Sequence, residues 1–90
     1  MKNVSAKVFN TRELIGENVV VTSKIPGLKY SGIMLEFFER NNSIVLRNYT
    51  VHRMKEGEWE VEGRGDLIII KGDGWAEIEV PKWSKIREYE

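Results

Sequence analysis

The sequence lacks cysteine and glutamine, has two prolines and one histidine, and carries no net charge, with 14 acidic and 14 basic residues. The absence of cysteine excludes disulfides and thiolate metal sites as supports for a chain of 90 residues, which is near the lower limit for independent folding. Dense packing or association with other chains must then supply the stability. The balanced charge argues against a generally basic nucleic-acid-binding surface, so a polyanion site requires local placement of charge.

A long apolar run is also missing. The stretch "MKNVSAKVFN" lacks the apolar region of a signal peptide, and no segment has the roughly 20 apolar residues that cross a bilayer. We therefore expect a cytoplasmic protein with no membrane partner. The acidic residues are nearly all Glu, a bias typical of thermophile proteins.

The first element predicted is a short helix. Asn10 can cap it, Glu13 can complete a capping box, and Gly16 can end it in the left-handed conformation. So short a helix is not stable alone, and Leu14 and Ile15 are expected to hold it against a core.

Five strands follow, separated by the turn signals "IPG", "MKEGE" and "KGDG". Their predicted ranges are 17–24, 28–39, 43–54, 58–71 and 75–80. In the second strand Gly32 permits a bend, and the broken alternation around Met34 and Leu35 favours a bulge. The run "LIII" predicts a segment buried on both faces.

A flat sheet of this size would leave one face bare. We therefore expect it to curl into a small barrel. The predicted fold class is all-β, with a short N-terminal helix followed by a five-stranded, strongly bent antiparallel barrel.

Two segments resemble the two motifs of the Sm-like (LSm) family, archaeal type. "GLKYSG", with the apolar strand, aromatic–acid pair and polar loop that continue to Asn48, is similar to the first motif, and "IIIKGDGWAEI" is similar to the second. The resemblance covers residues 10–80 and leaves residues 1–9 and 81–90 as N- and C-terminal extensions. It implies a small barrel of the Sm-like, SH3 type.

The resemblance also implies a homo-oligomeric ring, hexameric or heptameric, in which the fourth strand of one subunit pairs with the fifth strand of the next. Here those edges are "DLIII" and "AEIEV". Physical reasoning agrees, because an exposed apolar strand edge invites pairing with another chain.

In the family, the loops after the second and fourth strands meet at the pore and hold single-stranded RNA, preferably uridine, by stacking and base-edge hydrogen bonds. Lys71 replaces the family's Arg and lacks its planar fork, so weaker or altered uridine preference is expected. The RNA-binding candidates carried over are Glu39, Arg40, Asn41, Asn42, Ser43, Lys71, Gly72 and Asp73.

The alignment of the first loop to the family differs by one residue between its two ends. Counting forward from the motif's glycines puts Phe38 at the family's Asp and Asn42 at its loop Asn. Counting backward from the motif's end puts Glu39 at the Asp, Asn41 at the stacking residue and Ser43 at the loop Asn. A bulge in the preceding strand favours the backward count.

Two other functions stay open: a ring of the same fold that binds protein partners with little RNA affinity, and a monomeric SH3-like protein-binding module. We expect no catalytic residues, metal site or cofactor, and no enzyme activity. His52 lacks a partner pattern for metal binding or catalysis, and Trp75 is interpreted as a packing residue. The Glu residues at 56–62 recur at period two, which is typical of a solvated strand face.

Overall fold

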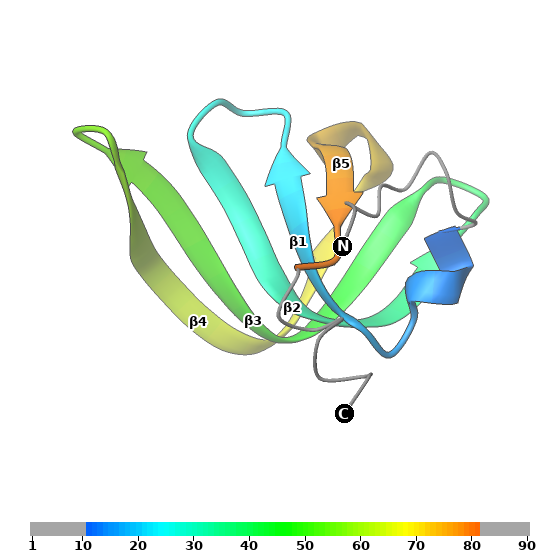
Figure 1. Ribbon diagram of the computed structural model, residues 1–90. Helices are drawn as coiled ribbons and strands as arrows, with labels where there is room; N and C mark the ends of the chain where they lie inside the picture. Colours follow the sequence, from blue (N-terminus) through cyan, green and yellow to red (C-terminus); the bar gives the residue numbers. More distant parts are fainter. Residues whose placement is uncertain (1–10, 82–90) are drawn as a thin grey trace.

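The computed structural model describes residues 11–81, which form one five-stranded antiparallel sheet with strand order β4-β3-β2-β1-β5 (Figure 1). The elements are η1 (Thr11–Leu14), β1 (Asn18–Ser23), β2 (Leu28–Phe38), β3 (Ser43–Lys55), β4 (Glu58–Ile70), η2 (Gly72–Gly74) and β5 (Trp75–Glu79). The predicted five strands and their order along the chain are confirmed. The sheet curves strongly along β2, β3 and β4, as the predicted barrel requires.

The predicted N-terminal helix is only a single 3-10 turn, η1, too short for the α-helical hydrogen-bond pattern. Its Leu14 is buried, and Gly16 follows with a φ of 94°, the left-handed conformation predicted for the helix end. The Gly16 N–H donates to the Met34 carbonyl at 2.8 Å, which ties the turn to β2. Asn10, the predicted cap, lies outside the described residues. Within the described residues, neither helical turn is long and apolar enough to cross a membrane.

Two irregularities interrupt the pairing of β2 with β3, and irregularities of this kind bend a strand. At Gly32 the pairing with β3 shifts, and a Cβ there would lie 2.9 Å from the Arg47 carbonyl oxygen. Glycine therefore permits an approach of the two strands that no other residue would. A second shift lies between Met34 and Glu36, which makes Leu35 the bulged residue. The bulge predicted around Met34 and Leu35 is confirmed.

The concave side of the sheet holds the core. This core is filled by alternate residues of β1 and β2 and by inward-facing residues of β3, β4 and β5. The turn η1 lies at one end of it. Its buried members are Leu14, Val19, Val21, Met34, Phe37, Ile44, Leu46, Ile70, Ile78 and Val80. Because these side chains come from every strand, the curled sheet encloses a single apolar interior.

The expectation that "LIII" is buried on both faces is wrong for the single chain. Ile70 is buried, but Leu67 and Ile69 are 58% and 65% exposed. The reason is topological: β4 is an edge strand, and its outward-facing side chains have no covering layer within residues 11–81. Leu35 and Phe38 are also exposed, so this end of the sheet carries several exposed apolar side chains.

Strands β3 and β4 form a long hairpin, and β2 pairs with its β3 side as far as Arg53 (Figure 1). All four of its regularly spaced Glu residues are exposed, as predicted. Glu62 lies at a shift in the pairing and accepts hydrogen bonds from Arg53, with a closest distance of 3.1 Å between Nη2 and Oε1. This guanidinium lowers the pKa of the Glu62 carboxyl.

On the outer face of the sheet, His52 of β3 lies opposite Lys29 of β2. Its Nε2 is hydrogen-bonded with Ser31 Oγ at 2.9 Å. Partial burial, and then the positive charges of Lys29 and Arg64, lower the pKa of His52. The folded protein thus favours the neutral imidazole.

This preference makes stability depend on pH. Unfolded His52 takes up a proton near its ordinary pKa of 6.5, whereas the folded residue resists protonation until the pH is lower. The contribution of neutral His52 to the free energy of unfolding is therefore complete above pH 6.5. It is lost as the pH falls from 6.5 through the lower pKa of the folded state. A His52→Gln variant should lose less stability than the parent between pH 7.5 and 5.5, measured by urea unfolding midpoints. Parallel losses in both proteins would exclude His52 as the cause.

Candidate functional site

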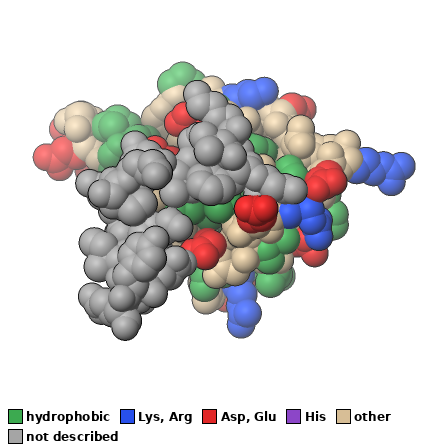
Figure 2. Space-filling model, turned by 45° about the vertical axis from the view of Figure 1, so that its right-hand side comes forward, with side chains coloured by type: hydrophobic (Ala, Val, Ile, Leu, Met, Phe, Trp, Pro, Cys, Tyr) green, Lys and Arg blue, Asp and Glu red, His purple; other side chains and the backbone are tan. Residues whose placement is uncertain are grey.

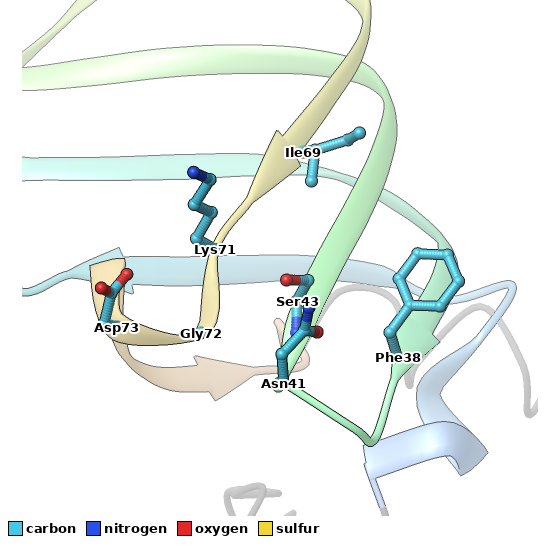
Figure 3. A pocket seen from close by; sticks show the side chains of 7 residues that line it. All are labelled: Phe38, Asn41, Ser43, Ile69, Lys71, Gly72 and Asp73. Atoms are coloured by element: carbon cyan, nitrogen blue, oxygen red, sulfur yellow. The ribbon is translucent and has the colours of Figure 1, made fainter.

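Two segments that are far apart in the sequence form one hollow of about 600 Å³. One is the loop between β2 and β3, and the other is the end of β4 with η2 (Figure 3). The side chains from both segments face the same space in Figure 3. The residues that line it are Phe38, Asn41, Ser43, Ile69, Lys71, Gly72 and Asp73.

Five of the eight residues predicted from the Sm resemblance line this hollow: Asn41, Ser43, Lys71, Gly72 and Asp73. The other three, Glu39, Arg40 and Asn42, are exposed in the same loop but do not line it. The structure therefore brings the two predicted segments together. The role of these residues in RNA binding stays a prediction.

The β2–β3 loop is shaped by its own side chains. The Asn41 Oδ1 accepts a hydrogen bond from the Ser43 N–H at 3.1 Å, and the Asn41 N–H donates to the Phe38 carbonyl at 3.3 Å. Asn42 has a φ of 59°, a conformation that Asn tolerates well. The carboxamide oxygen of Asn41 is thus engaged in the turn, while Ser43 is held nearly buried at the start of β3.

Contact between the two segments depends on Gly72. A Cβ at this position would overlap the Asn41 carbonyl oxygen and lie 2.8 Å from the Asn42 Cβ. The Trp75 indole N–H donates to the Asn42 carbonyl at 2.7 Å, which fastens the loop to the start of β5. Trp75 packs against the core as interpreted from the sequence, and it also joins the two halves of the site.

Two lining residues, Phe38 and Ile69, were not among the predicted site residues. Phe38 is 48% exposed at the end of β2, and Ile69 was expected to be buried. The signal for Phe38 was present in the bulge at Leu35, which shifts the alternation and turns Phe38 outward beside the loop. The signal for Ile69 lay in the family resemblance, which placed "DLIII" at an edge of the sheet, whereas the apolar run itself predicted burial.

The hollow combines groups of different chemistry. Phe38 offers an aromatic surface, Lys71 a cation, Asp73 an anion and Ser43 a hydroxyl. Such a set suits a planar polar ligand that can stack and form hydrogen bonds. Within residues 11–81 no group of three or more His, Asp or Glu side chains could hold a metal ion.

Charge on the described surface is mixed. Figure 2 shows basic and acidic side chains scattered among apolar ones, without a continuous basic area on the part of this face that is described. This agrees with the balanced composition. Attraction of a polyanion would then depend on a few local cations or on repetition of the site in an assembly.

The sequence matches no protein-family model and no curated protein. Among solved structures, the fold is similar to that of a Pyrococcus abyssii Sm protein in complex with a uridine heptamer, with 24% identity, a TM-score of 0.60, and coverage of 73% of this chain and 84% of that one. It is also similar to a chain of the NatC complex bound to CoA, with 13% identity, a TM-score of 0.64, and coverage of 91% and 96%. The chain has the Sm-like fold predicted from its motifs.

The contact at Gly72 can be tested with a matched pair of glycine variants. Gly72→Ala should destabilise the protein by about 1–3 kcal/mol, because the new methyl group forces the two segments apart. Gly74→Ala, two residues along, meets no atom within 4 Å and should change stability by less than about 0.5 kcal/mol. Urea unfolding of both variants measures the difference, and equal stabilities would refute a tight contact between the segments.

Proposed function

We propose that this chain is an Sm-like protein that forms a homo-oligomeric ring, hexameric or heptameric, and binds single-stranded, U-rich RNA in the hollow between the β2–β3 loop and η2. The observation that carries the proposal is the meeting of the two motif segments in one hollow with an exposed aromatic ring. A protein of the same fold is bound to a uridine heptamer. The proposed protein is a cytoplasmic, non-catalytic RNA binder.

Binding would rest on stacking. A base lies against the Phe38 ring, which takes the part of the aromatic platform that the loop residues Arg40 and Asn41 lack. Lys71 contributes a positive charge to the same hollow and meets a phosphate or a base carbonyl. Base–aromatic stacking is worth about 1–3 kcal/mol per base, and this is the contribution expected from Phe38.

Preference for uridine would come from the loop. Uracil presents a donor between two acceptors on its pairing edge. Because the Asn41 Oδ1 is engaged in the turn, the Asn41 amide N–H is directed to an acceptor, and the Ser43 hydroxyl can donate or accept. These groups can bond to the two carbonyl oxygens of uracil, and the comparison of oligouridine with oligoadenine tests whether they reject adenine.

Ring formation would use the edges of the sheet. Strands β4 and β5 are the two edges, and the exposed Leu67 and Ile69 lie on one of them. An apolar edge of this kind favours pairing with another strand. A ring repeats Arg40 and Lys71 around its pore, which gives a basic circle and multivalent binding from a chain without net charge.

A second candidate function is a ring or subunit that binds protein partners. Two observations favour it: Lys71 stands where the family has Arg, and the Asn41 oxygen is bound within its own loop. A chain of the NatC complex shares the fold over 91% of this chain. Retained assembly without RNA affinity would select this candidate.

The RNA site is tested by truncating its aromatic surface. Phe38→Ala should weaken binding of oligouridine about 5- to 150-fold per occupied site, the equivalent of one lost stacking contact. Lys71→Ala should reduce both the affinity and its dependence on salt. Fluorescence anisotropy with oligouridine and oligoadenine measures both effects.

The matched control for this test is Val61→Ala, an exposed apolar residue eight positions before Ile69 on the same strand. It should bind RNA like the parent protein. If Phe38→Ala and Lys71→Ala also bind like the parent, the hollow is not the RNA site. If the parent binds neither oligomer, the protein-partner function replaces this one.

Assembly is tested on the β4 edge. Leu67→Lys places a charge in the apolar edge and should convert a hexamer or heptamer into smaller species, observed by native mass spectrometry. Val61→Lys introduces the same charge at a similarly exposed position on the hairpin and should leave the ring intact. A monomeric parent protein would contradict the ring and favour the SH3-like module.

A further inference from the structure

A second hollow, of about 400 Å³, lies on the outer face of the sheet. Among residues 11–81, it shares no lining residue with the hollow between the loops. Its position follows from strand alternation: Leu28 is buried in the core, so the neighbouring Lys29 points to the opposite side. The residues relevant to its chemistry are Lys29, Ser31, Asn48, Thr50, His52 and Trp59.

Register aligns these side chains across three strands. Lys29 pairs with His52, and Ser31 pairs with Thr50, so the four side chains form a compact group on β2 and β3. Ser31 and His52 are hydrogen-bonded at 2.9 Å. The Lys29 ammonium lies 4.1 Å from the centre of the Trp59 ring on β4, a cation–π contact.

The electrostatic character of this hollow differs from that of the surrounding surface. The chain has 14 acidic residues, yet none of them is among the described residues that line the hollow. Within residues 11–81, no carboxylate lies within ion-pair distance of the Lys29 ammonium. Arg64 adds a second positive charge close enough to act on His52. The hollow therefore attracts anions.

The hydrogen-bonding groups are suited to a sugar and a base. Hydroxyls of Ser31 and Thr50, the carboxamide of Asn48 and the imidazole of His52 supply both donors and acceptors. Trp59 is 42% exposed and provides a large aromatic surface. The volume falls in the usual range for small-molecule sites, about 300–1,000 Å³.

We infer that the outer hollow binds a nucleotide, either a free mononucleotide or one residue of a single strand. The base stacks on Trp59 and takes the position that the Lys29 ammonium holds over the ring. The displaced ammonium then meets the phosphate of the same nucleotide. Polar side chains on β2 and β3 form hydrogen bonds with the sugar and with the edge of the base. This inference does not rest on the proposed function, because the two hollows have no described lining residue in common.

The test uses variants of the full-length chain that leave the core untouched. Trp59→Leu removes the ring, and Lys29→Met removes the charge but keeps the length of the side chain. Lys55→Met, at the exposed end of the same hairpin and outside the hollow, is the matched charge control. All variants also carry Phe38→Ala, so that ligand binding in the loop hollow is weakened equally in every sample. Unchanged thermal midpoints confirm that the variants fold.

Two sets of ligands, mononucleotides and oligonucleotides, distinguish a free nucleotide from one residue of a strand. AMP and UMP are titrated by calorimetry, and oligoadenine and oligouridine are followed by fluorescence anisotropy. Trp59→Leu and Lys29→Met should each weaken binding about tenfold, as expected for one stacking or one phosphate contact, whereas Lys55→Met should not.

An effect in the mononucleotide arm identifies a free nucleotide as sufficient, and an effect only in the oligonucleotide arm identifies a strand. No effect of Trp59→Leu and Lys29→Met in either arm, including the absence of any binding, overturns the inference. That result would leave the loop hollow, tested separately through Phe38, unaffected.

Discussion

The close approach of β2 and β3 at Gly32 is the constraint on which the structure depends. A Cβ at this point would lie 2.9 Å from the Arg47 carbonyl oxygen and 3.2 Å from the Tyr49 Cα. The pairing of the two strands shifts here, and the long strands bend through the shift. The bend lets one sheet enclose its own core. The two motif segments meet at one end of this curved sheet, because Ile44 of β3 pairs with both Phe37 of β2 and Ile70 of β4.

The strands, the turns and the bulge could be predicted because they are recorded in local patterns. Alternation, β-branched residues and turn signals are properties of short windows, and the interrupted alternation at Leu35 marked the bulge directly. Two outcomes needed information from the whole fold. The exposure of Leu67 and Ile69 follows from the edge position of β4, and the outward direction of Phe38 follows from the bulge before it.

The candidate site was only partly predictable for a related reason. No local pattern says that the loop after β2 lies against the segment after β4; the resemblance to Sm motifs supplied that expectation. The contact itself is explained by Gly72, where any side chain would collide with Asn41, and by the Trp75 hydrogen bond to Asn42. The sequence identified the two segments, whereas the choice of Phe38 as the aromatic surface required the geometry.

The absence of net charge conceals two different electrostatic environments. The loop hollow is lined by one cation, Lys71, and one anion, Asp73. On the outer face, Lys29 stands over Trp59 without an acidic neighbour among the residues described. A protein of zero net charge can therefore favour anions at chosen positions while it avoids the general attraction of a basic surface.

Ile69 connects the proposed assembly with the proposed site. It lies on the edge strand β4, is 65% exposed, and also forms part of the wall of the loop hollow. A neighbouring strand paired with β4 would cover this side chain and enclose the hollow further, which strengthens the hydrogen bonds and charge contacts inside it. The apolar edge that drives association would then also complete the site, so that assembly and ligand binding favour each other through one shared residue.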